Sequence, residues 1–281
     1  MSSTESHSRT DRGTRTTGIL RFIALLAAAS LLVFLVLPLV ALVWRAVRDF
    51  DGIDSETTET LREALTLTLM SSLVSLAVVV LLGTPLAYVL ARRRFRGAMV
   101  IETLVDLPMI LPPAVAGLAL LMAFGRRGLV GSVLDEQWGI TIGFTTAAVI
   151  LAQTFVATPF YVRAARSGFS RVDRELEDAA ADLGASPVRV LWSITLPMAR
   201  PALSAGAVLA WARAVGEFGA TIMFAGSIAG RTETMPLAVY GRYEAGDLNT
   251  ALVLAVILLG SAMLVLLAVR YSGNKGMDAT Q

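Results

Sequence analysis

Residues 64–91 read ALTLTLMSSLVSLAVVVLLGTPLAYVLA, a run without a single charged side chain. The hydrocarbon core of a bilayer is about 30 Å thick, and roughly 20 apolar residues in a helix cross it. The run exceeds that length and carries no charge that would have to enter the hydrocarbon. It therefore predicts a helix that crosses a membrane.

On either side of this run, the chain holds four more uncharged windows of spanning length and one apolar stretch interrupted by two charges. The uncharged windows are residues 22–44, 107–125, 137–162 and 248–269, and the interrupted stretch is 202–226. The first window is longer than the roughly 7–15 apolar residues of a secretory signal, so we expect a retained helix. The sequence thus predicts an all-α integral membrane protein with six transmembrane helices.

The composition excludes several kinds of chemistry. The chain has no cysteine and one histidine, His7, so it offers no thiolate metal site, no disulfide and no histidine-based catalysis. Its only lysine, Lys275, is followed by Gly276, whereas a P-loop needs Gly-Lys-Ser/Thr. The net charge of +2 is small and its arginines are dispersed, which does not suggest nucleic acid. We expect a chain without catalytic residues, metal or cofactor.

Basic residues gather in alternate connecting segments. The N-terminal tail, the segments that follow residues 91 and 162, and the C-terminal tail hold 16 Lys and Arg residues, and the other segments hold seven. The positive-inside rule then predicts a multi-pass protein of the cytoplasmic membrane with both termini inside. We expect residues 1–18 to form a disordered cytoplasmic tail, 19–271 the membrane domain and 272–281 a second cytoplasmic tail.

The predicted internal segment of residues 173–200 is long and contains residues typical of helix starts and helix ends. Asp173 is a candidate N-cap for a first short helix, and Gly184 suits the position after that helix, where a positive φ is needed. Ser186-Pro187 fits the N-cap and first position of a second helix. The pattern predicts a helix–turn–helix that projects from the membrane.

Two prolines follow in this segment. Pro197 and Pro201 are expected to end or kink the second helix before the fifth span. On physical pattern alone, the projecting element is either a solvated connector or a docking element for a cytoplasmic partner, since a short rigid helix can transmit a push. Both interpretations are open at this point.

The same segment resembles the coupling loop of bacterial and archaeal ABC importer permeases, whose motif is acid-Ala-Ala, three residues, Gly, nine residues and Ile-x-Leu-Pro. The matching residues are Asp178, Ala179, Ala180, Gly184, Ile194, Leu196 and Pro197. Asp178 stands where the family usually has Glu. The resemblance implies that the loop docks in a groove of an ATP-binding subunit, and that the small residues allow close approach of two backbones.

Two further segments, residues 107–113 and 212–222, resemble the corresponding parts of molybdate permeases, and those of sulfate and tungstate permeases less closely. The resemblance extends over residues 60–270. It implies candidate pathway and gate residues at Pro108, Pro112, Pro113, Arg213, Glu217, Phe218 and Gly219.

The physical role of these candidates has two readings. Arg213 and Glu217 are four residues apart and share a helix face, so they form either a structural salt bridge or part of the ion path. The three prolines either shape helix packing or open the third helix toward a water-filled cavity.

By this resemblance, the chain is the permease subunit of an ATP-driven importer of an oxyanion, with molybdate expected first and tungstate or sulfate/thiosulfate as alternatives. The implied partners are a second copy, two cytoplasmic subunits that bind ATP and Mg²⁺, one extracytoplasmic oxyanion-binding protein and membrane lipid. A secondary transporter would show internal repeats, and none is visible. A membrane enzyme would need an acid–base pair that no span supplies.

Overall fold

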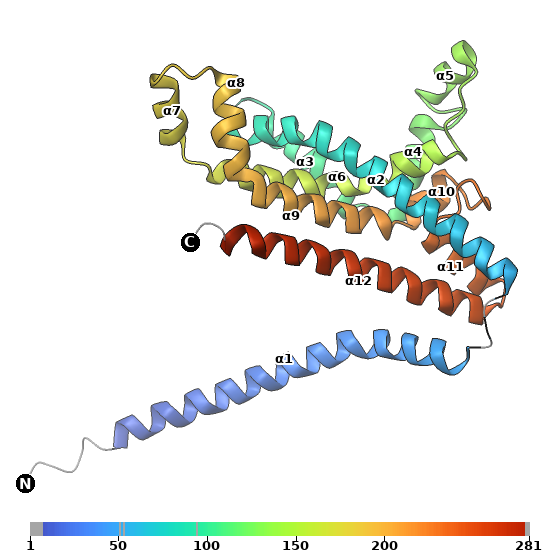
Figure 1. The fold of residues 1–281 in the computed structure, drawn as a ribbon, viewed down its shortest axis with the longest axis horizontal. Coiled ribbons are helices and arrows are strands. Elements are labelled where there is room, and N and C mark those ends of the chain that lie inside the picture. Colours follow the sequence, from blue (N-terminus) through green and yellow to red (C-terminus); the bar gives the residue numbers. More distant parts are fainter. Residues whose placement is uncertain (1–7, 51, 53, 94, 279–281) are drawn as a thin grey trace, which may run out of the picture. The chain divides into compact units, whose positions relative to one another are not determined.

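The computed structural model describes residues 8–50, 52, 54–93 and 95–278, with side chains from Arg21 to Leu264 and at Leu267 in these ranges. Every regular element in the described ranges is a helix (Figure 1), which confirms the predicted all-α class. The elements are α1 Ser8–Arg48, α2 Ser55–Arg92, α3 Ala98–Ile110, α4 Pro113–Phe124, α5 Gly131–Trp138, α6 Thr146–Arg171, α7 Arg174–Asp182, α8 Pro187–Val190, a π-helical segment Leu191–Thr195, α9 Leu196–Val215, α10 Gly219–Phe224, α11 Met235–Glu244 and α12 Leu248–Asp278.

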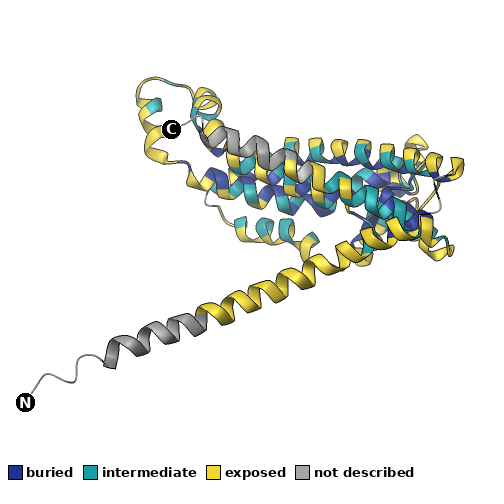
Figure 2. Ribbon diagram, turned by 60° about the horizontal axis from the view of Figure 1, so that its bottom comes forward, coloured by how far each residue is buried: buried dark blue, intermediate teal, exposed yellow. Residues whose placement is uncertain are grey.

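The chain forms two compact units, residues 1–51 and 52–281. In the first, the most apolar window of α1 has no buried residue, and its described side chains are exposed along almost the whole helix (Figure 2). A helix that is apolar all round suits a lipid environment. α1 begins at Ser8, inside residues 1–18, for which a disordered tail was expected; residues 1–7 lie outside the described part of the chain.

The core of the second unit is formed by α2, α6 and α9, which pack along one another (Figures 1 and 2). Small residues allow the close approach, because a side chain at Gly206 would come within 2.8 Å of Ala164. Polar side chains in the core bond to neighbouring helices. Ser75 donates to the carbonyl of Ile150 at 3.0 Å, and the Trp211 indole donates to Ser72 at 3.0 Å.

Among the described residues, three helices are long and apolar enough to cross a membrane: Arg21–Arg48, Ser55–Arg92 and Thr146–Arg171. The bent pair of α3 and α4 adds a fourth if it counts as one span, and the described apolar part of α12, Leu248–Leu264, is shorter. In the window 137–162, α5 ends at Trp138 and the long helix α6 begins only at Thr146, because the residues between them include Gly139 and Phe144 at positive φ. The count of six spans remains a prediction.

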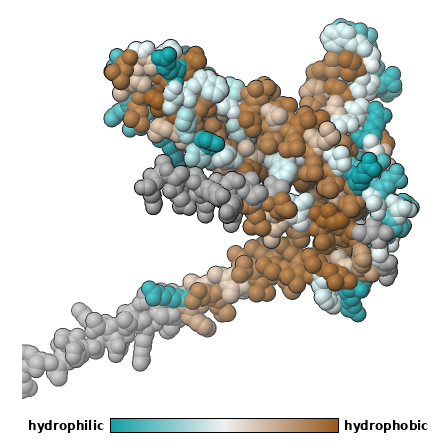
Figure 3. Space-filling view, viewed as in Figure 1, coloured by the Kyte–Doolittle hydropathy of each residue, from teal (hydrophilic) through white to brown (hydrophobic). Residues whose placement is uncertain are grey.

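The second unit has two different ends. α7 and α8 lie at one end, and α5, α10 and α11 lie toward the other (Figure 1). Hydrophilic residues gather around α7 and near the start of α2, with hydrophobic residues between them (Figure 3). This distribution is typical of a helix bundle whose middle faces lipid.

Candidate functional site

The first short helix of the projecting segment has the caps that the sequence predicts. Asp173 accepts a hydrogen bond from the backbone N–H of Glu175 at 3.0 Å. α7 ends in a Schellman turn, in which the N–H of Ala185 bonds to the carbonyl of Ala180 at 3.0 Å and Gly184 takes a φ of +86°. No atom lies within 4 Å of a Cβ added to Gly184, so the glycine is required here by its backbone angle.

The second helix begins as predicted but does not end at the prolines. Ser186 accepts a hydrogen bond from the N–H of Arg189 at 3.4 Å, and Pro187 is the first helical residue. From there α8, the π-helical segment and α9 form one uninterrupted helical run to Val215. Pro197 and Pro201 were expected to end or kink this helix before the fifth span. They do not end it, because both lie inside α9.

The π-helical turn gives the physical reason. The N–H of Leu196 bonds to the carbonyl of Leu191, five residues back instead of four. A proline ring clashes with the preceding turn of a regular α-helix, and a wider turn just before Pro197 relieves that clash. We call residues 174–215 the arm: it comprises α7, the turn at Gly184 and the continuous helical run of residues 187–215.

The motif residues of the arm divide into two groups. Asp178, Ala179, Gly184 and Pro197 are exposed, and Ala180 and Ile194 are half-buried. Leu196 is half-buried and packs against the core cluster that includes Val172 and Ala199. Large apolar side chains near the turn are also exposed: Leu183, Val188 and Trp192. An exposed apolar patch beside polar residues is typical of a protein–protein contact.

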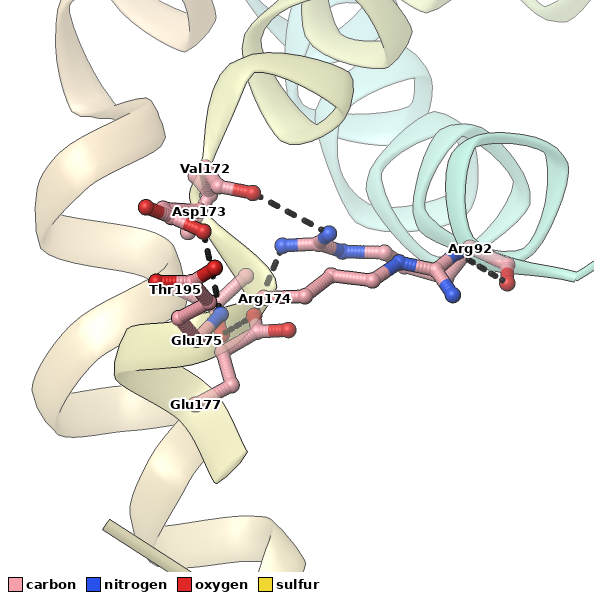
Figure 4. Close-up of polar contacts among 7 residues, drawn as sticks. All are labelled: Arg92, Val172, Asp173, Arg174, Glu175, Glu177 and Thr195. Carbon is pink, nitrogen blue, oxygen red and sulfur yellow. Dashed lines mark hydrogen bonds and ion pairs between the residues drawn. The ribbon is translucent and has the colours of Figure 1, made fainter. Parts of the chain in front are cut away.

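One contact in the arm was missed at the sequence level. The Glu177 carboxylate lies 2.7 Å from a guanidinium nitrogen of Arg92 and accepts a hydrogen bond from the Thr195 hydroxyl at 2.6 Å (Figure 4). Arg92 also donates to the carbonyl of Val172 at 3.2 Å, and Arg174 donates to the carbonyl of Arg92 at 3.1 Å. The sequence gives one sign of this contact, which is a second acidic residue, Glu177, directly before Asp178.

The third predicted span is broken. The helix axis bends by 118° from α3 to α4, across Leu111 and Pro112. Residues 107–113 were expected to form the beginning of this span. They lie instead at the junction of α3 and α4, because α3 already begins at Ala98. Pro108 lies inside α3, Pro112 is the N-cap of α4 and Pro113 is its first residue. The three prolines therefore lie at or next to the bend.

The stretch 202–226, expected as one span, is also interrupted. α9 ends at Val215 and α10 begins at Gly219. The intervening Glu217 is nearly inaccessible, and its carboxylate accepts a hydrogen bond from the N–H of Ala220 at 2.7 Å. A side-chain acceptor thus satisfies a free backbone donor at the start of α10, which stabilises the break.

The two breaks pack against each other through α4 and α10. A side chain at Gly219 would collide with Pro113, and a Cβ at Gly117 would come 2.7 Å from the carbonyl oxygen of Ala220. The ring of Phe218 packs against that of Tyr240 in a tilted arrangement, with the centroids 5.0 Å apart. Candidate residues from the two separate segments, Pro113 and Gly219, are therefore in contact.

The predicted pair of charges lies at the second break. A guanidinium nitrogen of Arg213 lies 2.5 Å from the Glu217 carboxylate. The Arg213 side chain is 29% exposed and that of Glu217 is 1% exposed. The carboxylate is enclosed within the protein, whereas the arginine side chain is partly accessible. The structure thus contains the predicted salt bridge between Arg213 and Glu217.

Two further ion pairs join the broken span to α6. Asp106 lies 3.7 Å from Arg163, and Glu102 lies 2.9 Å from Arg166. The acids are four residues apart on α3 and the arginines three apart on α6, so each pair lies one helical turn from the other. These contacts hold α3 against the same helix that packs along the arm.

Residues 83–275 match the family described as the binding-protein-dependent transport system inner membrane component. The chain is 44% identical over 263 residues to the molybdenum transport system permease protein of Mycobacterium tuberculosis, covering 93% of this chain and 98% of that protein. It is 34% identical over 250 residues to the probable sulfate transport system permease protein of Chlorokybus atmophyticus, covering 88% of this chain and 86% of that protein.

A solved structure shares the fold. The crystal structure of a bacterial ABC transporter involved in the import of the acidic polysaccharide alginate matches with a TM-score of 0.73, covering 95% of this chain and 99% of that chain. The sequence identity is 15%, so this likeness concerns the fold alone. With the family match over 83–275, these findings show that the chain belongs to the binding-protein-dependent transport system inner membrane components.

Proposed function

We propose that two copies of this chain form the membrane path of an ATP-driven importer for a tetrahedral oxyanion, with molybdate as the first candidate. ATP and Mg²⁺ bind to two separate cytoplasmic subunits, and one extracytoplasmic protein delivers the ion. The chain itself carries no catalytic group. The molybdenum transport permease of Mycobacterium tuberculosis, 44% identical over nearly its whole length, supports the choice of cargo.

One observation carries the mechanical part of the proposal: the uninterrupted helical run from Pro187 to Val215. Its first turn follows the exposed motif residues around Gly184, and its last turn carries Arg213. A helix is stiff along its axis, so movement of the projecting turn by an ATPase would be delivered to the break beside Glu217. The exposed Asp178 and Ala179 would lie in the contact with that ATPase.

The path proposed for the ion follows the two broken helices. Irregular backbone at membrane depth is tolerated where it is enclosed by protein or lines a water-filled cavity. Arg213 supplies a forked cationic group to a passing anion, while Glu217 keeps the net charge near zero when no ion is present. Pro113, Gly219 and Phe218 bring α4 and α10 close enough to form a gate.

A second candidate cargo is sulfate, because the probable sulfate permease of Chlorokybus atmophyticus is 34% identical over most of its length. Sulfate and molybdate are both tetrahedral dianions and present the same oxygens to an arginine. The receptor that delivers the ion would choose between them.

The proposed topology has six spans in the cytoplasmic membrane, with both termini inside. Beyond the three spanning helices and the bent pair α3–α4, it takes α9 with α10 as one broken span and α12 as another. The arginine-rich segments after α2 and α6 lie at the end of the second unit that carries α7, which would be the cytoplasmic end (Figure 1).

Uptake of radioactive molybdate by proteoliposomes tests the function directly. The vesicles contain the permease co-purified with its ATP-hydrolysing subunit, together with the receptor encoded with it. We expect the uptake to require both ATP and the receptor, and to be abolished by an excess of unlabelled molybdate. Uptake of radioactive sulfate but not of molybdate under the same conditions would assign the second cargo, and uptake without ATP would refute an ABC importer.

A further inference from the structure

We propose that Glu177 and Arg92 form a positioning anchor that ties the arm to α2, so that a push on α7 reaches two membrane helices and not α9 alone. This inference rests on the proposed coupling function. It gives the neighbouring acids separate roles: Glu177 holds the arm from within, and Asp178 faces the partner subunit.

The anchor joins four elements at one point (Figure 4). The Glu177 carboxylate on α7 meets Arg92 at the end of α2, at 2.7 Å, and the hydroxyl of Thr195 on the π-helical segment, at 2.6 Å. Arg92 reaches the carbonyl of Val172, directly after α6, at 3.2 Å. The return bond from Arg174 to the carbonyl of Arg92 closes the network.

The burial of this network separates it from ordinary surface ion pairs. The Arg92 side chain is 9% exposed and that of Glu177 is 17% exposed, whereas the pair Arg45–Asp49 on α1 is 58% and 36% exposed. Exposed pairs contribute little to stability because water screens them. A largely buried charge that loses its partner is left unsatisfied, so each member of the anchor depends on the other.

Asp178 has none of these contacts. It is exposed, and within the described residues no hydrogen bond or ion pair of its carboxylate occurs. Successive residues of an α-helix point about 100° apart, so α7 cannot turn both acids toward Arg92. The helix therefore presents one carboxylate to the bundle and leaves the next one free.

The anchor also has a mechanical consequence. Without it, the hydrogen bond from Arg174 to the backbone carbonyl of Arg92 still joins α7 to the end of α2, but no side chain of α7 is held to both α2 and Thr195. With it, the end of α2 and the start of α9 are held to the same carboxylate. Because α2 and α9 also pack along each other, movement of α7 would carry them together.

The test uses the complete transporter in proteoliposomes, comparing Glu177→Ala, Arg92→Ala and the double variant. We expect each single variant to keep its ATP-hydrolysing subunit and to hydrolyse ATP, while molybdate transported per ATP falls by about tenfold, within the range for directly interacting pairs. The double variant should be no worse than either single one. A conservative change and an exposed ion pair provide the control: Glu177→Asp shortens the acid by one methylene and should also uncouple, whereas Asp49→Ala, which removes the exposed partner of Arg45, should not.

A second readout does not depend on the cargo. The chain has no cysteine, so Ala181→Cys on the exposed face of α7 accepts a single nitroxide label. Label mobility in the assembled complex should rise with Glu177→Ala and Arg92→Ala and stay unchanged with Asp49→Ala, which breaks an exposed pair elsewhere. A merely destabilised fold would raise mobility for all variants alike and would not distinguish the two acids.

Each outcome decides the question. Normal transport per ATP and unchanged label mobility in the Glu177 and Arg92 variants would overturn the anchor while leaving the importer intact. Loss of the ATP-hydrolysing subunit from Glu177→Ala would overturn it too, by assigning Glu177 to the docking contact. If the wild-type complex hydrolyses ATP but moves no molybdate, the proposed cargo fails, and the label mobility still decides the anchor.

Discussion

Replacing Arg213 with alanine should separate the two roles that its ion pair could have. The change leaves the carboxylate of Glu217, whose side chain is 1% exposed, with one hydrogen bond, from the N–H of Ala220. Breaking a buried ion pair on one side costs about 3–5 kcal/mol. Since Arg213 is 29% exposed and water can reach its side of the pair, we expect the lower end, about 3 kcal/mol. That is a large part of the roughly 5–15 kcal/mol that stabilises a typical fold.

The double variant Arg213→Ala/Glu217→Gln supplies the control. Glutamine keeps an oxygen for the N–H of Ala220 and removes the lone charge, so stability should return to within about 1 kcal/mol of wild type. Molybdate uptake should stay low, because the cationic donors on the path are gone. Arg213→Lys keeps the charge but loses the fork, and should transport at an intermediate rate.

Thermal unfolding of the detergent-purified complex and ATP-dependent molybdate uptake are measured on the same preparations. Wild-type uptake by the double variant would show that Arg213 only neutralises Glu217, and the proposed path would lose its cationic residue. A melting temperature of Arg213→Ala equal to that of wild type would contradict the burial argument itself.

Three further predictions concern the turn of the arm, the helix crossing and the segment before α6. Gly184→Val places a β-branched residue at a φ of +86°, which costs about 1–2 kcal/mol locally; uptake should fall while ATP hydrolysis persists, and unchanged uptake would count against the coupling role. Gly117→Ala puts a Cβ 2.7 Å from a backbone oxygen of α10 and should lower stability by about 1–3 kcal/mol in a thermal unfolding assay, whereas Gly260→Ala, with no atom within 4 Å, should not. The hydrogen bond from Arg126, and then the one from Thr141, lowers the pKa of Asp135 from its ordinary value of 3.8. These bonds hold α5 in place at neutral pH and are lost only as the pH falls below about 4, where Asp135 begins to take up a proton. A nitroxide label on α5 that becomes mobile near neutral pH would contradict this.

The parts of the site that sequence analysis predicted are those governed by local rules. Asp173, Gly184 and Ser186-Pro187 each act through backbone groups within three or four residues, and all three take the predicted conformations. The bend near Pro112 follows from missing N–H groups and was likewise predictable. Such features need no knowledge of the rest of the fold.

The features that were missed depend on contacts between distant segments. The end of α9 at Val215 lies inside an apolar stretch, and it is stabilised by the side chain of Glu217 and by the packing of Gly219 on Pro113, over 100 residues earlier. The choice between Glu177 and Asp178 as the inward-facing acid depends on where Arg92 lies, which no local pattern indicates.

The π-helical turn determines how the two ends of the arm are related. One additional residue in a turn rotates everything beyond it by about 100° around the axis, so the wide turn at Leu191–Thr195 fixes which way the break at Gly216 faces when Glu177 is bound to Arg92. Thr195 is the last residue of this turn, is buried and donates to Glu177, so the same turn both sets the rotation and holds it. An arm fixed in this way would transmit rotation as well as displacement. Helical continuity stops only after Val215, and so, under the proposed function, motion delivered by an ATPase would be absorbed beside the Arg213–Glu217 pair, at the point where α10 packs on the broken span.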